Sequence, residues 1–453
     1  MKPGRALQVV VMLAVLAALL SARSYSLSRR TTPDRSAPAA PVGLYNPDPN
    51  DIWNRVHDSL LVRRGTDGGR YGSDTVDPLL WTNTTFLRGR KSQRRALESL
   101  DEFLRTHAEK AVTDPSKRAV FQHDFWAVFD WVASENLNGV DHALLVRLAQ
   151  VMRRVALTPD QVRALPDTYS NALASGEFAR VYDSANPQRA FLPPDLLRPD
   201  GPWICLTGYS ADPTAITHFS GRSRFLVFLR LPGGRQATLG YVQKLLDSPE
   251  PLFVKGAVPN GKMFNLSLPQ FPTGTEVALL RQMIMIDAEG NLVPTALTES
   301  VQVRVYHAVT PGSPYINYHD GPSSHDQDFF ELRIARPALF AGRSGGLLAV
   351  RPGETEYSSV FLFGIDPFEA SRKDAWVRQP NDILGSCRAC HADSGIHSVQ
   401  SREQWLGQHQ RNRGPGWEPS LSRAVNWETD KTIDRKQRQD NFKILLRYWY
   451  SPS

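Results

Sequence analysis

Two of the chain's three cysteines stand close together near its carboxyl end, and a histidine follows them at once. The stretch from Ser386 to Ser398 reads Ser-Cys-Arg-Ala-Cys-His-Ala-Asp-Ser-Gly-Ile-His-Ser, which contains Cys387-x-x-Cys390-His391. Residues three apart on a helix share one face, so both thiols and the imidazole can reach one bound group. The fold must therefore leave room for that group beside a helical turn.

This spacing suits covalent attachment of a porphyrin. Two thiols on one turn of helix can form thioethers with the vinyl groups on one porphyrin edge, and the adjacent imidazole then turns to the iron. The pattern predicts haem c, with Cys387 and Cys390 as thioether attachments and His391 as the proximal iron ligand. Three alternatives are a Cys387–Cys390 disulfide, a thioredoxin-like redox pair, and a zinc site. The zinc site would use Cys387, Cys390, His397 and His409, four N/S ligands without the common finger spacing.

The amino terminus has the outline of a secretory signal. Lys2 and Arg5 precede an apolar run from Ala6 to Leu20, and small residues follow. We expect residues 1–24 to be a signal peptide cleaved after Ser24, or a short N-terminal membrane anchor, since the run falls slightly short of a usual span. The chain is then periplasmic or attached to the outer face of the cytoplasmic membrane.

Length and charge restrict the function further. The 453 residues far exceed what a simple electron carrier needs, and the formal net charge is +7. Removal of residues 1–24 takes away three positive charges and no acid. We therefore expect no nucleic-acid partner; a modest basic surface could steer an acidic redox partner protein or an anionic membrane face.

Composition and periodicity divide the chain into segments and predict an α+β multidomain fold. After residues 1–24, the segments are a Pro/Ser/Arg-rich linker (25–50), an N-terminal helical domain (51–195), an antiparallel β-sandwich or partial barrel (196–366), and a small α-helical, haem-binding segment (367–453).

Particular runs carry these assignments. In the helical domain, Phe121, Phe125 and Phe129 recur at helical spacing, which favours a helix core over a haem-lining face. Thr158-Pro159-Asp160 opens a further helix. The predicted strands are Arg224–Leu231, Glu276–Ile286, Val301–His307, Phe329–Ile334 and Ser358–Ile365. Asp287 to Asn291 predicts a hairpin connection, and Thr429 to Tyr450 predicts one closing helix.

Other candidate sites have simpler interpretations. Gly342-Arg343-Ser344-Gly345-Gly346 matches G-x-S-x-G but leaves no room for the helix that a hydrolase needs, which favours a turn. Gly256 to Lys262 resembles a P-loop until Met263 replaces the magnesium-binding hydroxyl. Cys205, among apolar neighbours, is expected to be buried. An acidic loop could bind a metal or offer the iron a second ligand, although a solvated loop is the default; it holds His319, Asp320, His325, Asp326 and Asp328.

The carboxyl end resembles class I cytochromes c. The likeness consists of the Cys387-x-x-Cys390-His391 motif, a loop with Gly414-Pro415-Gly416, and a terminal helix with Leu445 and Trp449. It covers about the last 80 residues, and only the motif is specific. The resemblance implies haem c, with electron transfer as its use.

One departure from that family concerns the sixth iron ligand. The family's distal methionine follows the motif, whereas the last methionine here is Met285. The position could be vacant, or it could be filled by His409, by a histidine of the acidic loop or helical domain, or by a methionine of the β region. The candidate histidines of the helical domain are His57, His107, His123 and His142. The candidate methionines of the β region are Met263, Met283 and Met285.

The sequence thus supports three hypotheses. The first is an exported monohaem c-type protein that transfers electrons, with the upstream domains docking a partner or housing a second site. The second is a haem-dependent oxidoreductase with an open distal iron site, where a small ligand or peroxide could bind. The third is an exported binding or scaffold protein stabilised by zinc.

Overall fold

The structure combines helices with antiparallel sheets, which confirms the mixed α+β class. It is a computed structural model. It describes residues 43–65, 68–72, 84–88, 91–135, 142–208, 213–214, 221–248, 253–255, 262–311, 325–356, 366–369, 381–391, 393–399 and 420–451. The predicted signal or anchor (1–24), most of the linker and the strand predicted at Ser358–Ile365 lie outside these ranges.

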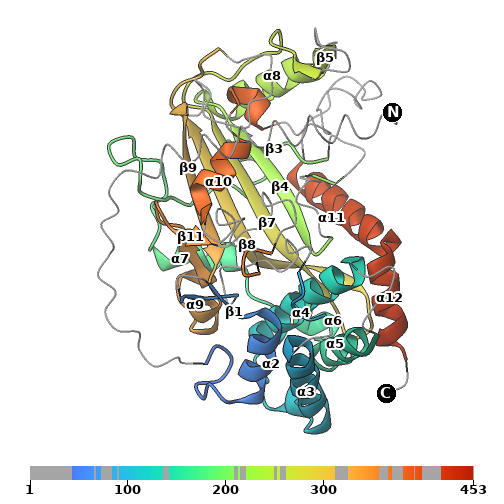
Figure 1. The fold of residues 1–453 in the computed structure, drawn as a ribbon. Coiled ribbons are helices and arrows are strands. Elements are labelled where there is room, and N and C mark those ends of the chain that lie inside the picture. The colour runs from blue at the N-terminus through green and yellow to red at the C-terminus, as the bar shows by residue number, and fades with distance from the viewer. Residues whose placement is uncertain are drawn as a thin grey trace, which may run out of the picture.

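Four helices form a block at one end of the molecule (Figure 1). This helical block comprises α2 (Ile52–Leu61), α3 (Lys91–Arg105), α4 (Pro115–Glu135) and α5 (His142–Val155). Every residue of α4 from 119 to 133 is buried, which makes it the central helix, because a helix buried all round needs neighbours on every side.

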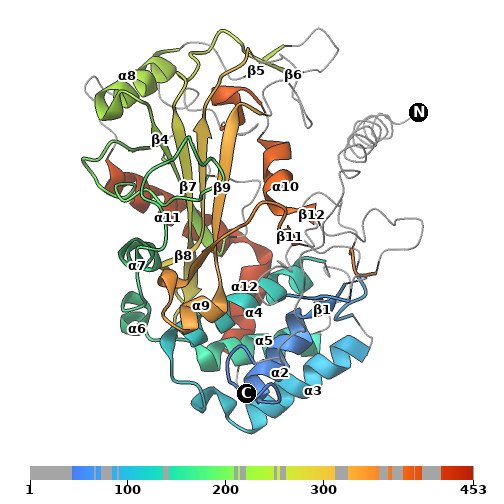
Figure 2. The same ribbon diagram turned by 90° about the vertical axis from the view of Figure 1, so that its left-hand side faces the viewer.

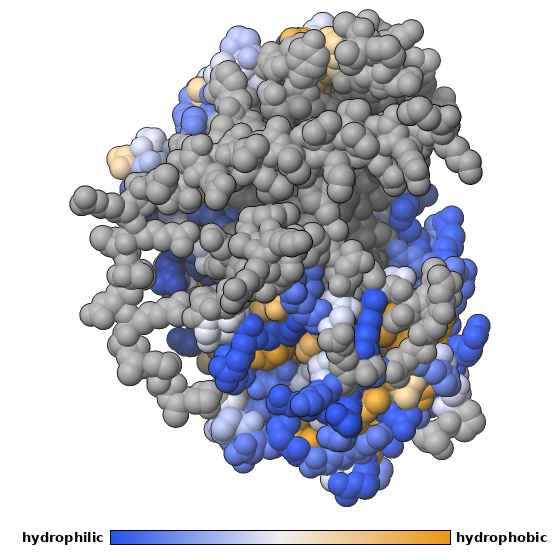
Figure 3. Space-filling model, in the orientation of Figure 1, coloured by the Kyte–Doolittle hydropathy of each residue, from blue (hydrophilic) through white to orange (hydrophobic). Residues whose placement is uncertain are grey.

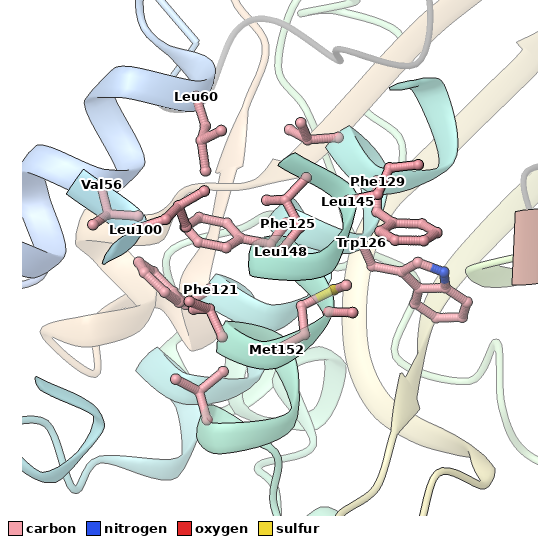
Figure 4. Close-up of a cluster of buried hydrophobic side chains, with 14 of the residues drawn as sticks. Val56, Leu60, Leu100, Phe121, Phe125, Trp126, Phe129, Leu145, Leu148 and Met152 are labelled. Atoms are coloured by element: carbon pink, nitrogen blue, oxygen red, sulfur yellow. The ribbon is translucent and has the colours of Figure 1, made fainter. Parts of the chain in front are cut away.

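The aromatic side chains of α4 fill the core of the block. Phe121, Phe125 and Phe129 pack with Leu145 and Leu148 of α5 (Figure 4). Full burial of each such side chain contributes roughly 1.5–3 kcal/mol. The prediction that this stripe is a helix core is confirmed.

Short helices lead from the block toward the sheet. After η2 (Ala108–Lys110) inside the block come α6 (Pro159–Arg163) and α7 (Thr168–Ser175). The predicted start of α6 is confirmed: Thr158 and Gln161 form a reciprocal capping box, and Pro159 occupies the first turn.

A six-stranded antiparallel sheet forms the centre, in the order β10-β9-β8-β7-β4-β3. The strands are β3 (Ile204–Cys205), β4 (Ser223–Arg230), β7 (Glu276–Ile286), β8 (Leu292–Tyr306), β9 (Gln327–Ile334) and β10 (Leu347–Ala349). Three two-stranded ribbons flank it: β1 (Arg63–Arg64) with β2 (Arg70–Tyr71), β5 (Phe253–Lys255) with β6 (Lys262–Phe264), and β11 (Thr355–Glu356) with β12 (Asn381–Asp382).

The hairpin predicted between β7 and β8 is confirmed. Ile286 pairs with Leu292, and the five residues between them form the connection. The Asp287 carboxylate accepts the backbone N–H groups of Glu289 and Asn291 at 2.9 and 2.8 Å. Gly290 has a φ of +86°, a conformation that glycine adopts without steric cost.

The β region differs from the predicted sandwich or partial barrel. Helix α8 (Gly234–Asp247) follows β4 where no helix was expected, and the six-stranded sheet is open, with β10 and β3 at its edges. Within the described ranges, helices rather than a second large sheet cover its faces (Figure 2). The buried residues Thr238, Tyr241 and Leu245 of α8 recur at helical spacing, a signal that the strand-rich surroundings obscured.

The two faces of the sheet carry different elements. On one face, Leu226, Leu280 and Val301 pack against α7, the irregular chain after it, and α11 (Leu421–Arg438). On the other, Leu229 and Val277 pack against α8. Helix α10 (Ile383–Cys390) lies on this second face beside β9. The cysteine-histidine motif thus rests on a sheet.

The carboxyl terminus forms two helices where one was predicted. They are α11 and α12 (Asp440–Trp449). The chain is extended at Gln439 between them, and the buried Lys436 ammonium donates to the side chains of Gln439 and Asn441. Phe442 and Trp449 of α12 enter the core of the helical block, so the terminal helix contributes to that block.

The remaining short elements are α9 (Arg336–Phe340), η5 (Ser344–Gly346) and η7 (Gly395–Ser398). Hydrophilic residues predominate on the side of the helical block shown in Figure 3. Among the described helices, none is both long enough and apolar enough to cross a membrane.

Candidate functional site

Helix α10 carries the motif at its carboxyl end. Asp382 accepts the backbone N–H of Gly385 at 2.6 Å and so caps the first turn. Ile383 and Leu384 then anchor the helix in a small core with Phe329 of β9 and Val350. Cys387 lies in the helix and Cys390 is its last residue. The side chains of both cysteines are outside what the structure describes.

His391 follows the helix directly and is half-buried. Its Nδ1 lies 2.8 Å from the backbone oxygen of Ser398. A carbonyl oxygen only accepts, so Nδ1 must donate, and in the neutral ring the lone pair is then on Nε2. This is the arrangement typical of metal-ligating histidines, whose other ring N–H donates to a carbonyl or carboxylate.

The backbone of His391 is held as well. Its N–H donates to the oxygen of Arg388 at 3.1 Å, an i→i−3 bond that adds a tighter turn to the end of the helix. Its carbonyl accepts the side-chain amide of Gln327 at 2.5 Å. Because Gln327 begins β9, the sheet itself fixes where the histidine leaves the helix.

Residues 393–399, here called the docked turn, hold Ser398 in place. Ile396 is buried in the core beneath α8, and its N–H donates to Gln270 at 3.0 Å. The Ser394 hydroxyl donates to the oxygen of Thr310 at 2.5 Å. Gly395 has a φ of +47°, and a Cβ there would lie 2.1 Å from Gln270 Oε1. Only glycine fits this position without a shift of its neighbours.

Two residues of β8 reach Ser398 from the sheet. Arg304, 7% exposed, donates from Nη1 to the Ser398 carbonyl oxygen at 3.0 Å. The Tyr306 hydroxyl lies 2.5 Å from Ser398 Oγ. The carbonyl that accepts the His391 imidazole therefore also accepts a buried guanidinium.

His397, a residue of the zinc alternative, uses both ring nitrogens within the fold. Nε2 donates to the oxygen of Asn265 at 3.1 Å, and Nδ1 accepts the amide of Gln270 at 3.3 Å. Burial lowers the pKa of His397, which keeps the ring neutral, and the ring packs on Phe264 with centroids 4.7 Å apart. These contacts give His397 a structural role. His409 lies outside the described residues.

The structure describes the acidic loop only from His325 onward, so His319 and Asp320 lie outside the described residues. Asp326 accepts the backbone N–H and the hydroxyl of Thr310 at 2.5 and 2.9 Å. Asp328 accepts the Tyr182 hydroxyl and lies 3.4 Å from His307. His325 is exposed. Within the described ranges, no group of three or more His, Cys, Asp or Glu side chains is placed to hold a metal ion.

The histidines proposed as distal ligands from the helical block lie within that block or at its contacts. His57 is fully buried in α2, with Nδ1 3.5 Å from Asp58, and His107 is exposed beside Glu109. His123 lies 3.2 Å from the oxygen of Arg222, and burial lowers its pKa. His142 bonds the Tyr448 hydroxyl at 2.9 Å.

The methionine candidates and the G-x-S-x-G match occupy structural positions, whereas residues 256–261 of the P-loop match lie outside the described residues. Met283 and Met285 are buried in a core shared with α4 and α6, and Met263 lies in β6. Ser344 of the G-x-S-x-G match sits in a short 3-10 turn and donates to Glu177, which agrees with a turn. Cys205 is buried as predicted, and burial raises its pKa to about 12, so its thiol is unreactive.

Sequence reasoning missed the residues that position His391, namely Arg304, Gln327 and Ser398. It also missed a buried ionic contact between the helical block, the sheet and α11. There Asp130 Oδ2 accepts Lys436 Nζ at 2.6 Å and Arg222 Nη1 at 3.0 Å. Arg304 carries a sequence signal, because it is a charge between Val303 and Val305 in a predicted strand. Ser398 acts through its backbone and carries none.

Comparison of the chain with models of known protein families, with curated proteins and with solved structures finds no match. The motif and the geometry around it are therefore the features that bear on the function.

Proposed function

We propose that this protein is an exported monohaem c-type protein that transfers electrons. Cys387 and Cys390 would hold the porphyrin through thioethers, and His391 Nε2 would bind the iron. The observation that carries the proposal is the 2.8 Å contact between His391 Nδ1 and the Ser398 carbonyl oxygen, because it places the lone pair of the neutral ring on Nε2, the atom that would bind the iron.

The residues present fit such a group chemically. A bound haem c supplies a one-electron carrier whose potential depends on its axial ligands and their hydrogen bonds. The chain's own part is to fix the ligand: Asp382 starts the helix, Gln327 holds the His391 carbonyl, and Ser398 orients its ring. The helical block and the rest of the sheet would dock a redox partner protein or house a second site.

The first test is whether haem stays attached after denaturation. The full chain is produced in a bacterial strain that matures c-type haem, and a pyridine haemochrome spectrum is recorded on the denatured protein. We expect retained haem, and its loss in the double variant Cys387→Ser/Cys390→Ser, which can form neither thioether. Cys205→Ala is the matched control, because that thiol is buried away from the motif. A wild-type chain that retains no haem contradicts the proposal.

The oxidoreductase remains the second candidate, since the described residues provide no established sixth ligand. Spectra with and without cyanide or carbon monoxide separate the two. Iron that exchanges no ligand supports a carrier, whereas rapid binding supports an open site. The zinc scaffold predicts stoichiometric zinc and no Soret band. The involvement of both His397 nitrogens in other bonds weighs against the zinc set described above.

Export is tested separately, since periplasmic fractionation with and without residues 1–24 reports the compartment. A mature chain that begins after Ser24 indicates cleavage, and a full-length membrane-bound chain indicates an anchor.

A further inference from the structure

The Arg304 guanidinium bonds neutral groups, as does that of Arg224 on β4, which donates to Gln282, Thr429 and the Thr295 carbonyl oxygen. Other arginines that lie on or next to the central sheet have acidic partners. Several of these pair with a carboxylate, as Arg230 does with Glu276 and Arg281 with Glu299, at 3.0 and 3.1 Å. Within the described ranges Arg304 forms no ion pair, and its bonds go to the carbonyl oxygen and the hydroxyl of Ser398. Its partners are therefore neutral.

The neighbours of Arg304 across the strands are apolar. Its register partners are Val277 on β7 and Phe329 on β9, and both are buried. In such surroundings a charge is weakly screened and acts over a longer range than at the surface. A cation fixed here would influence any charge change near His391.

The Ser398 carbonyl connects the cation to the candidate iron ligand. It accepts from Arg304 Nη1 at 3.0 Å and from His391 Nδ1 at 2.8 Å. The guanidinium draws electron density toward itself, so the carbonyl is a weaker acceptor for the imidazole N–H. A weaker acceptor leaves the imidazole less electron-rich, and a less electron-rich ligand stabilises the oxidised metal less.

We propose that Arg304 is a positioning residue that holds the Ser398 carbonyl on the His391 imidazole and raises the reduction potential of the iron bound there. This inference depends on the proposed haem. Its two contributions have the same sign: the weakened acceptor destabilises ferric iron, and the nearby positive charge stabilises the added electron.

The experiment is a spectroelectrochemical titration of the haem-loaded full chain. Arg304→Gln removes the charge and keeps a hydrogen-bond donor, and Arg304→Lys keeps the charge. Arg351→Gln is the control, because it removes one positive charge from a side chain that is 85% exposed. In Arg304→Gln we expect the ratio of reduced to oxidised protein at a fixed potential to fall about tenfold, which is about 59 mV for one electron. Arg304→Lys and Arg351→Gln should remain within about twofold of wild type.

Each outcome decides the question. An unchanged potential in Arg304→Gln overturns the inference and leaves the haem proposal intact, whereas wild-type protein without attached haem overturns the proposed function itself. If Arg304→Gln fails to fold, Arg304→Met decides in its place, because it removes the charge and keeps a long side chain: a fall of about tenfold supports the role of the charge, and a potential near that of wild type contradicts it.

Discussion

Helix α11 and the docked turn are both held by buried cations, but the partners of these cations differ. At the ionic contact, Arg222 and Lys436 share the carboxylate of Asp130. At the docked turn, Arg304 meets only the carbonyl and hydroxyl oxygens of Ser398 among the described residues. The first arrangement places a carboxylate between its two cations and serves to join α4 to α11. The second leaves Arg304 without a carboxylate partner among the described residues, beside the motif, where a charge can act on chemistry.

This difference predicts which of the two sites contributes more to the stability of the fold. A shared carboxylate makes the ionic contact depend strongly on each partner, because removal of one leaves buried charge behind. The docked turn depends on several neutral hydrogen bonds, each worth about 1 kcal/mol. We therefore expect substitutions at the ionic contact to lower the free energy of unfolding most. Substitutions around the docked turn should affect the motif and lower the free energy of unfolding less.

The largest effect should follow Asp130→Asn. This change leaves Arg222 and Lys436 buried without their carboxylate, and we expect the free energy of unfolding to fall by about 3–5 kcal/mol. Urea unfolding followed by circular dichroism measures it. Asp101→Asn is the control, because Asp101 forms an ion pair with Arg147 at the surface and should change stability by less than about 1 kcal/mol. Similar losses in both variants would contradict the distinction.

The next largest expected effect is a dependence of stability on pH that comes from Glu428 of α11. Burial raises the pKa of Glu428 to about 7 from its ordinary 4.5, and its carboxylate accepts the backbone N–H of Thr214. The folded state therefore keeps a proton that the unfolded chain releases above pH 4.5. The stability from this group is present below pH 4.5 and is lost as pH rises toward 7.

Glu428→Gln mimics the protonated form and should remove this slope. We expect the variant to match wild type near pH 4.5 and to exceed it by roughly 3 kcal/mol at pH 8. Urea unfolding at several pH values provides the measurement, with Glu98→Gln on the exposed side of α3 as the control. Parallel stability curves for wild type and Glu428→Gln would show that Glu428 does not titrate in this way.

A smaller effect is expected at the docked turn from Gly395→Ala. The new Cβ meets Gln270 at a φ of +47°, so the side chain that binds Ile396 and His397 must move. We expect a loss of about 2 kcal/mol. Gly176→Ala separates strain from collision, because Gly176 also has positive φ but has nothing within 4 Å of the added atom; it should lose about 1 kcal/mol. Equal losses in the two would show that the collision is relieved.

The fold was predictable where local periodicity determines the structure. The α4 stripe, the helix start at Thr158, the Asp287 hairpin and four strands of the central sheet follow from short-range patterns, and the structure contains them. A sandwich or barrel is not shown among the described residues, where α8 occupies a stretch with two glycines between strands. The prediction of a single closing helix was wrong, because Gln439 is extended next to a buried lysine.

Only part of the candidate site could be predicted from the sequence. The motif residues are contiguous, and cysteine spacing alone identifies them. Their support is distant in the chain: Arg304 and Gln327 reach residues 94 and 64 positions away, and only sheet register brings them there. The decisive acceptor is a backbone carbonyl, which every residue possesses. No side-chain pattern could have identified it.

The smallest effect should come from the cap of the motif helix. Asp382→Ala removes the acceptor for the Gly385 N–H, and loss of a cap costs about 1 kcal/mol. An eight-residue helix has little stability of its own, so the loss should appear as faster amide hydrogen exchange within residues 383–390. The control on the other side of the comparison is Ser420→Ala, which removes a longer, 3.5 Å cap from α11. Because α11 is also held by Lys436 and Asp130, its exchange should change less. If both helices loosen equally, the motif helix is held by its packing on β9 rather than by its cap, and Phe329 becomes the residue to substitute next.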